Sequence, residues 1–268
     1  MSEEKKLVLQ ATDVSIVFGG LCAVSEFSCE LREGELVGLI GPNGAGKTTL
    51  FNMFSGVYTP TSGQISFWDR NDHVHIINKM NPAQLNKLGI ARTFQNIRLF
   101  GSLSVTDNVR VALHNSRTVN PFDVVLRTPR FFRDEKLMTE RTVELLQLFK
   151  IDGKKDELAK NLPYGEQRKL EIVRALASNP KLLLLDEPAA GMNPQETVEL
   201  MKMIDFIRTQ FHLTILLIEH DMKLVMGICE RIMVLDYGRV IAAGAPEEIR
   251  SNPQVIKAYL GSDAGAGK

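Results

Sequence analysis

Cysteine is scarce in this sequence, and charge of neither sign is in excess. The three cysteines, Cys22, Cys29 and Cys229, form no C-x-x-C pair. This scatter predicts reduced core thiols in a cytosolic protein rather than a disulfide framework. Lysine and arginine together number 32, as do aspartate and glutamate. Because there is no net field to attract an anionic polymer, we expect no nucleic-acid partner.

Long apolar runs and internal repeats are also missing. No segment reaches about 18 to 20 consecutive apolar residues, so the chain is not expected to span a membrane by itself. The opening residues, MSEEKKLVLQ, are charged and lack the apolar core of a signal peptide. With 268 residues, 44% of them apolar, the chain has enough material for one large domain or two small ones with a sizeable core.

The most informative stretch is GPNGAGKTT, which follows the apolar run Leu36–Ile40 and fits the pattern G-x-x-x-x-G-K-[ST]. Glycines let successive N–H groups point inward as a nest for phosphate oxygens, and the helix expected next adds the positive end of its dipole. A lysine supplies a cation for the terminal phosphates, and a threonine hydroxyl suits Mg²⁺. The expected phosphate-binding residues are Gly41, Pro42, Asn43, Gly44, Ala45, Gly46, Lys47, Thr48 and Thr49.

The rest of the chain alternates strand and helix patterns. Continuous apolar runs at 36–40, 181–185, 213–218 and 231–237 predict buried strands, and the helical patterns between them indicate a parallel sheet covered on both faces. Apolar–polar alternation at 7–17 and 24–31 predicts strands near a sheet edge. Residues 103–160 show helical spacing and interrupt this α/β core as a lobe.

Within that lobe, the segment RTPRFFRDEK, residues 127–136, is basic and aromatic. We interpret it as a solvated loop in preference to a nucleic-acid contact, because one short patch in a neutral chain is weak evidence for the latter.

Polar residues with catalytic potential follow the predicted strands. Asp186 and Glu187 come directly after the leucine run, where ligands bind in open α/β sheets. We assign Asp186 to the Mg²⁺ shell through water and Glu187 to the general base that polarises the attacking water. His220 ends another buried strand and is expected to contact a γ-phosphate. Gln95 follows residues 90–94 and is expected to coordinate Mg²⁺ or the attacking water.

Taken together, these residues resemble the ATP-binding cassette (ABC) family over about residues 7–250. GPNGAGKT looks like the Walker A loop, LLLLDE like Walker B, Gln95 like the Q-loop and His220 like the switch histidine. LPYGEQ, residues 162–167, falls at the signature LSGGQ, and AAGMN, residues 189–193, at the D-loop. The resemblance places Phe18 against the adenine and Tyr164, Gly165 and Glu166 at the nucleotide of an opposite subunit.

A narrower resemblance is also present. The strings RTFQNIRLF, LPYGEQRKLEI, DEPAAGMNP, IEHDMKLVM and VIKAYLG look like the ATPase subunits of branched-chain (hydrophobic) amino-acid importers of bacteria and archaea. Urea-importer and lipopolysaccharide-export ATPases share parts of these strings.

Two positions depart from the family pattern. Pro163 occupies the position of the usual signature serine. Proline has no hydroxyl and no N–H, so phosphate must rely on backbone donors from Gly165 onward. Asn193 occupies the position of the usual D-loop aspartate; it can hydrogen-bond across a dimer but carries no charge.

The resemblance implies one ABC ATPase domain over residues 1–268, with a catalytic core at about 7–94 and 168–250, a helical lobe at about 96–167 and a disordered tail at 262–268. It implies a P-loop fold with a mostly parallel sheet, an antiparallel β subdomain and the inserted lobe. The cofactors expected are ATP and Mg²⁺. The catalytic residues expected are Glu187, His220, Gln95 and Lys47, and the metal ligands are Thr48, Gln95 and Asp186.

The implied partners are a second ATPase subunit, identical or different, transmembrane permease subunits and, indirectly, an extracytoplasmic substrate-binding protein. The chain would then lie peripherally on the cytoplasmic face of the inner or plasma membrane. The alternatives are a related ABC system for urea import or lipopolysaccharide export, a soluble, non-transport ABC ATPase serving the ribosome or DNA repair, and a P-loop kinase or GTPase that uses the phosphate loop alone. The single cassette without a long coiled-coil insertion argues against the soluble ABC ATPase. The signature region, Glu187 and His220 argue against the kinase or GTPase. The transported molecule, the direction of transport and the identity of the partner cassette do not follow from the chemistry of this chain.

Overall fold

The computed structural model describes residues 5–115, 126 and 128–263. The chain divides into two compact units. The first unit combines residues 1–95 with residues 181–268, and the second comprises residues 96–180. Within the described residues, no helix has the length and apolar character needed to cross a bilayer.

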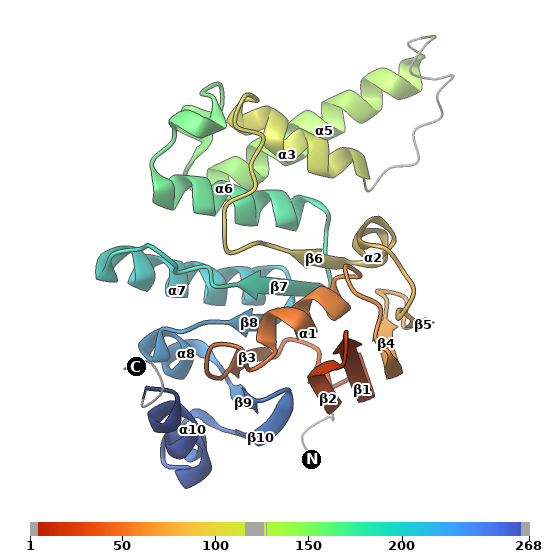
Figure 1. Cartoon of the computed structure of the whole chain (residues 1–268). Coiled ribbons are helices and arrows are strands. Elements are labelled where there is room, and N and C mark those ends of the chain that lie inside the picture. The colour runs from red at the N-terminus through yellow and green to blue at the C-terminus, as the bar shows by residue number, and fades with distance from the viewer. Residues whose placement is uncertain (1–4, 116–125, 127, 264–268) are drawn as a thin grey trace. The chain divides into compact units, whose positions relative to one another are not determined.

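A six-stranded sheet forms the centre of the first unit, in the order β10-β9-β3-β8-β7-β6 (Figure 1). The pairs β9–β3, β3–β8, β8–β7 and β7–β6 are parallel, and β10 alone runs antiparallel to its neighbour. The strands are β3 (Leu36–Ile40), β6 (Ile90–Arg92), β7 (Leu182–Asp186), β8 (Thr214–Ile218), β9 (Arg231–Asp236) and β10 (Arg239–Gly244). The predicted parallel sheet is confirmed, and its central strands are buried on both faces, as continuous apolar runs require.

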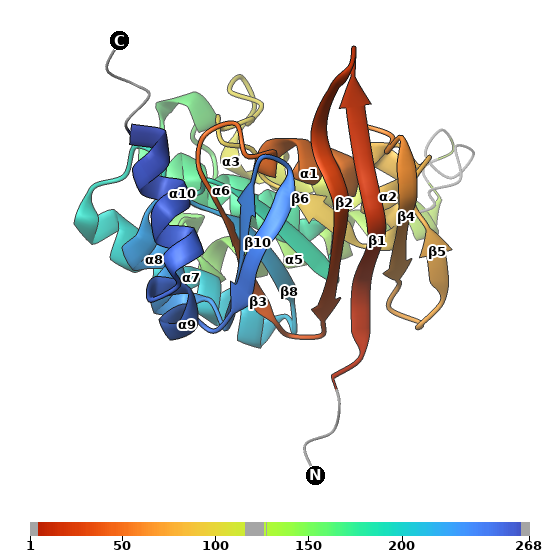
Figure 2. The same cartoon turned by 60° about the horizontal axis from the view of Figure 1, so that its bottom comes forward.

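A second, antiparallel sheet in the same unit has the order β2-β1-β4-β5 (Figure 2). Its strands are β1 (Leu7–Phe18), β2 (Leu21–Arg32), β4 (Ser62–Trp68) and β5 (Val74–Ile76). The alternating burial of β2 matches its alternating sequence, and β2 lies at an edge of this sheet, as predicted. This sheet is the predicted antiparallel subdomain.

The helices of the first unit pack on the two faces of the parallel sheet. One core cluster joins α1 to alternate residues of the parallel strands and to the antiparallel sheet. On the other face, a Cβ added to Gly38 would lie 3.1 Å from side-chain atoms of Val225 in α8 and of Cys229 directly after it, so glycine permits the close approach of that helix. These helices are α1 (Lys47–Phe54), α2 (Pro82–Leu88), α7 (Pro194–Gln210), α8 (Met222–Ile228), α9 (Pro246–Arg250) and α10 (Pro253–Asp263).

The second unit is helical (Figure 1). It contains α3 (Val105–Asn115), α5 (Pro129–Leu148), α6 (Tyr164–Ala177) and short 3-10 turns at Asp152–Lys154 and Ala159–Asn161. In α3 the residues Val105, Val109 and Leu113, which are spaced to share one helix face, are buried. Helix α3 packs against both α5 and α6, so the three form one helical cluster.

Two local predictions are wrong. Cys22, expected as a core thiol, is exposed in β2, whereas Cys29 and Cys229 are buried as expected. The segment 127–136 was interpreted as a solvated loop, but from Pro129 onward it forms the first turns of α5. Thr128 caps that helix by accepting a hydrogen bond from the Phe131 N–H, and Pro129 occupies the first helical position, where its missing N–H costs nothing. The predicted disordered tail at 262–268 lies outside the described residues from position 264 onward, and α10 includes Ser262 and Asp263.

Candidate functional site

The predicted site residues of the first unit follow strands that end at one edge of the parallel sheet. Asp186 of β7 is paired with Ile218 of β8, and Ile218 is paired with Leu39 of β3. Because parallel strands share their direction, the loops that follow them emerge together at the carboxyl edge. The phosphate loop, Glu187 and His220 are therefore gathered by the topology.

The phosphate loop has the backbone that its glycines allow. Gly41, Gly44 and Gly46 all have positive φ, and a Cβ on Gly41 would lie 2.0 Å from the carbonyl oxygen of Leu235. Helix α1 begins directly after Gly46, so its N-terminal N–H groups face the end of the loop. Thr48 is exposed in the first turn of that helix. These are backbone features that the predicted phosphate nest requires, and the phosphate binding itself stays a prediction.

Lys47 is buried at the base of this loop. Its Nζ donates to the carbonyl oxygens of Gly41 at 2.7 Å and Pro42 at 2.8 Å. Burial lowers the pKa of Lys47, and the charges of Glu187 and Asp186 oppose that shift. An ammonium group has three N–H bonds, so the two carbonyls leave one for a phosphate oxygen.

Glu187 is held on both sides by the other predicted catalytic residues. His220 Nε2 lies 2.7 Å from Glu187 Oε1, and Gln95 Nε2 donates to Glu187 Oε2 at 2.6 Å. Glu187 has φ +45°, a left-handed conformation that is unusual for a non-glycine residue and typical of functional sites. Each carboxylate oxygen has two lone pairs, so a water can still hydrogen-bond to Glu187.

Asp186 is buried and paired with an arginine that the sequence analysis did not assign. Arg92 Nη2 donates to Asp186 Oδ2 at 2.7 Å. Among the described residues, no hydrogen bond reaches Asp186 Oδ1, so that oxygen remains for a hydrated cation. Within the same part of the chain there is no group of three or more His, Cys, Asp or Glu arranged to hold a metal.

Glu219 is a second residue that the sequence analysis left without a role. Its buried carboxylate accepts the N–H of Ala189 at 2.6 Å and the N–H of His220 at 3.0 Å. Burial raises the pKa of Glu219 above its usual value, and these N–H groups only partly offset the shift. Glu219 thus fixes the start of the predicted D-loop to the backbone of the histidine.

Phe18 lies at the end of β1, where the sequence resemblance places the adenine. Its ring is partly exposed and contacts Tyr58 edge to face, with centroids 5.2 Å apart. Tyr58 was not predicted, and it follows α1 on the loop to β4. Both rings are partly exposed, so the pair offers aromatic surface to solvent.

The predicted signature residues begin α6 in the second unit. Pro163 is the N-cap and provides no side-chain hydrogen bond, and the Gln167 N–H donates to its carbonyl oxygen. Gly165 and Glu166 thus precede the first helical hydrogen bond of α6, which is where backbone donors for an anion are expected. The carboxylate of Glu166 is paired with Lys154 at 2.7 Å.

Asn193, at the position of the usual D-loop aspartate, caps its own helix. Its Oδ1 accepts the N–H groups of Gln195 and Glu196, and the Glu196 carboxylate accepts the Asn193 N–H in return. This capping box starts α7 and uses the side-chain oxygen of Asn193 within the subunit.

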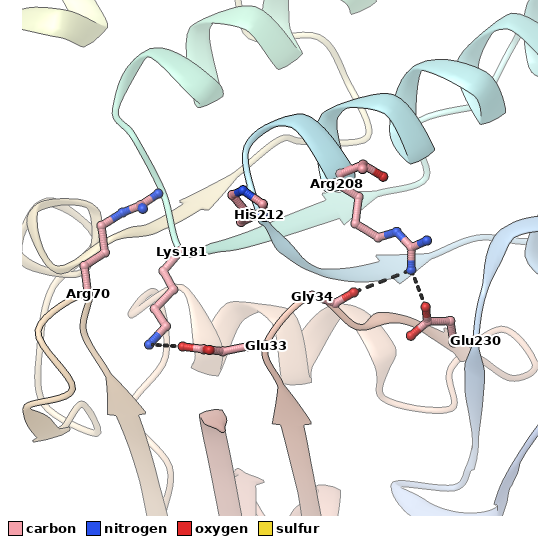
Figure 3. Close-up of a pocket in the computed structure, with 8 residues that line it drawn as sticks. Glu33, Gly34, Arg70, Lys181, Arg208, His212 and Glu230 are labelled. Atoms are coloured by element: carbon pink, nitrogen blue, oxygen red, sulfur yellow. Dashed lines mark hydrogen bonds and ion pairs between the residues drawn. The ribbon is translucent and has the colours of Figure 1, made fainter. Parts of the chain in front are cut away.

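Cavities formed by the described residues of the first unit include two of several hundred Å³. One, of about 610 Å³, is lined by Pro42–Ala45 of the phosphate loop together with the β9–β10 turn and α10. The other, of about 560 Å³, lies at the amino edge of the parallel sheet and contains the ion pairs Lys181–Glu33 and Arg208–Glu230 (Figure 3). None of the predicted site residues lines the second cavity, and most of its charged side chains are paired with an opposite charge.

Comparison with known families gives the identity of this arrangement. A family model described as "ABC transporter" matches residues 24–190, more than half of the chain. The chain belongs to the ABC transporter family. As a member of that family, it binds ATP and hydrolyses it in support of transmembrane transport. A second model, described as "Branched-chain amino acid ATP-binding cassette transporter", matches residues 239–265.

Individual relatives extend along almost the whole chain. The high-affinity branched-chain amino acid transport ATP-binding protein LivG of Salmonella typhimurium is 46% identical over 254 residues, which are 95% of this chain and 98% of LivG. BraF of Pseudomonas aeruginosa, with the same description, is 42% identical at the same coverage. The lipopolysaccharide export system ATP-binding protein LptB of Escherichia coli is 33% identical.

Solved structures agree with the fold. The ADP conformation of MJ1267, an ATP-binding cassette of an ABC transporter, superposes with a TM-score of 0.81 at 27% identity. The match covers 96% of this chain and 99% of the MJ1267 chain. The predicted fold class, a P-loop cassette with a mostly parallel sheet, an antiparallel subdomain and a helical insertion, is confirmed. The roles of individual site residues stay predictions.

Proposed function

We propose that this chain is the ATP-hydrolysing subunit of an importer for branched-chain or other hydrophobic amino acids. The similarity that supports this substrate class is the 42–46% identity to LivG and BraF along nearly the full chain, together with the match at residues 239–265. LptB, at 33%, provides weaker support for lipopolysaccharide export. The chain acts at the cytoplasmic face of the membrane, bound to permease subunits.

The hydrolytic role rests on one observation, the convergence of Gln95 and His220 on the two oxygens of Glu187. In this proposal Glu187 accepts a proton from the water that attacks the γ-phosphate. His220 and Gln95 hold the carboxylate so that it faces that water. Lys47 places a positive charge at the γ-phosphate, where negative charge develops in the transition state.

The residues also fit a magnesium ion bound together with the nucleotide. Mg²⁺ prefers oxygen ligands, keeps several waters and is held by few protein groups plus phosphate oxygens. The Thr48 hydroxyl, the Gln95 amide and the open Oδ1 of Asp186 supply such groups. When bound, Mg²⁺ neutralises charge on the phosphates. The aromatic pair Phe18–Tyr58 takes the adenine.

Each chain carries one phosphate loop and one signature region, so two subunits are needed to enclose a nucleotide. The N-terminus of α6, at Tyr164, Gly165 and Glu166, donates to the γ-phosphate held by the opposite subunit. ATP then links the subunits, and loss of the γ-phosphate releases them. The second subunit is either identical or a sister cassette, and a substrate-binding protein outside the cytoplasm delivers the amino acid.

Transport assays in cells test this proposal. In a strain that lacks the gene for this chain, wild-type protein should restore uptake of radiolabelled leucine, and Glu187→Gln should not. A matched control is Glu247→Gln, an exposed acid in the first turn of α9, which should restore uptake fully. Restored urea uptake or lipopolysaccharide export, with leucine uptake unchanged, would show that the substrate class is wrong.

A further inference from the structure

The sequence places a single arginine in the strand that leads to Gln95, and the structure buries it. Arg92 is the last residue of β6, and its side chain is only 8% exposed. The preceding strand residues, Ile90 and Ala91, are buried and apolar. A guanidinium in such a place loses its hydration, so its partners decide whether it can be tolerated.

Three structural elements supply these partners. Arg92 Nη2 donates to Asp186 Oδ2 at 2.7 Å, at the end of β7. Nη1 donates to Asn52 Oδ1 at 2.7 Å, within α1, and to Ser55 Oγ at 2.8 Å, directly after that helix. The guanidinium also lies over the rings of Phe51, at 5.7 Å, and Phe94, at 5.0 Å.

Stability alone does not account for this arrangement. A buried ion pair typically contributes little net stability compared with apolar residues of the same volume, because both charges lose their hydration. Here Arg92 Nε is also buried without a hydrogen-bond partner among the described residues, which adds a further cost. The position of the arginine in the site gives a better reason for its presence.

The two elements that Arg92 connects, α1 through its C-terminal part and β7 through its last residue, carry the two side chains expected nearest the magnesium ion. Helix α1 begins at Lys47 and carries Thr48 in its first turn, and β7 ends at Asp186. By holding α1 and Asp186 together, one planar guanidinium fixes the distance between the threonine hydroxyl and the aspartate. It also occupies Oδ2, so that Oδ1 is the oxygen presented to the ion.

We propose that Arg92 is a positioning residue for magnesium, which acts by clamping the Asp186 carboxylate to helix α1. This inference rests on the proposed magnesium site. It predicts that loss of Arg92 weakens magnesium binding with nucleotide, while nucleotide binding without the metal stays nearly unchanged. A purely structural role would weaken both in the same proportion.

The experiment measures binding of a fluorescent methylanthraniloyl-ADP to the purified full chain, with excess EDTA and across a MgCl₂ titration. Arg92→Met should raise the MgCl₂ concentration at half-maximal effect by roughly 10–100-fold, the usual loss when a group that orients a metal ligand is removed. Affinity in EDTA should change by less than about twofold. Arg92→Lys, which keeps the charge but lacks the planar fork, should give a smaller shift.

The control is Arg231→Met. Arg231 begins β9 at the amino edge of the parallel sheet, away from the carboxyl edge that holds the site. Its Nη2 lies 3.1 Å from Glu35 Oε2 and 2.6 Å from the Glu30 carbonyl oxygen. Its loss removes an arginine–carboxylate pair from the same sheet and should leave the MgCl₂ midpoint at the wild-type value. A midpoint for Arg92→Met equal to that of Arg231→Met would overturn the inference, as would equal losses with and without magnesium.

A double variant tests whether Arg92 acts through Asp186. Asp186→Asn alone should raise the MgCl₂ midpoint, and Arg92→Met combined with it should raise it no further, because two residues of one pathway are not additive. A further rise in the double variant contradicts the inference. If Asp186→Asn leaves the midpoint unchanged, the proposed magnesium site itself is wrong. If Arg92→Met does not fold, an unshifted midpoint in Arg92→Lys overturns the inference by itself.

Discussion

Replacing Gly46 with alanine tests the backbone geometry of the phosphate loop. Gly46 has φ +101°, and a Cβ built on it would lie 2.6 Å from the carbonyl oxygen of Ala23. A non-glycine residue in such a conformation costs about 1–3 kcal/mol. Overpacking against atoms that cannot move aside costs roughly 1–3 kcal/mol more. Together the two contributions lower the free energy of unfolding of Gly46→Ala by roughly 2–6 kcal/mol.

Gly44→Ala is the matched control. Gly44 has φ +79°, but no heavy atom lies within 4 Å of a Cβ placed there. Its cost is therefore the backbone contribution alone, about 1–3 kcal/mol. Urea unfolding of both variants without nucleotide measures the difference directly. If Gly44→Ala proves as destabilising as Gly46→Ala, the contact between the loop and Ala23 does not constrain the site and the reasoning fails.

Three further variants and one chemical probe test other parts of the account. Glu187→Gln should keep ATP affinity but lower turnover roughly 10²–10⁴-fold, the usual contribution of a general base; wild-type turnover would remove Glu187 from that role. Pro163→Ser should tighten ATP-driven dimerisation, measured by light scattering, because the hydroxyl adds a donor and an N-cap, and unchanged or weaker dimerisation would refute this. Burial raises the pKa of Glu219 above its usual 4.5, so the folded state holds a proton there more tightly than the unfolded state. As pH rises above about 4.5, the free energy of unfolding of the wild type should therefore fall relative to that of Glu219→Gln. A difference between the two proteins that stays constant from about pH 4 to 8 would contradict the shift. Burial raises the pKa of Cys29 and Cys229 to about 12, whereas Cys22 is exposed. Iodoacetamide at pH 8 should therefore modify Cys22 first, and equal labelling of all three cysteines would show that the core opens.

Much of the fold could be predicted because its signals are local. Continuous apolar runs located the parallel strands. Asn81 followed by Pro82 is a comparable local signal, because an N-cap residue and a proline at the first helical position start α2, where Asn81 also forms a capping box. The same kind of signal, Thr128 followed by Pro129, marks the start of α5, but the basic and aromatic composition there was given more weight. A cap with proline at the first helical position is therefore better evidence than composition for the start of a helix.

Only the part of the site that directly follows the ends of strands could be predicted from the sequence. The carboxyl edge of a parallel sheet gathers Glu187 and His220, which lie 2.7 Å apart, although the sequence indicated no contact between them. Arg92 and Glu219 were missed because their partners are distant in sequence: Arg92 contacts a residue 94 positions away and Glu219 one 30 positions away. In each case the signal was a charged residue within or directly after an apolar strand.

The account depends most on where the nucleotide binds. A crystal structure of Glu187→Gln with ATP and Mg²⁺ tests this directly. We predict that the main-chain N–H groups of residues 44–48 surround the phosphates, that Lys47 Nζ lies about 3 Å from a γ-phosphate oxygen, and that position 187 faces the same phosphate. Nucleotide bound elsewhere, or residues 186 and 187 turned away from it, would contradict the account.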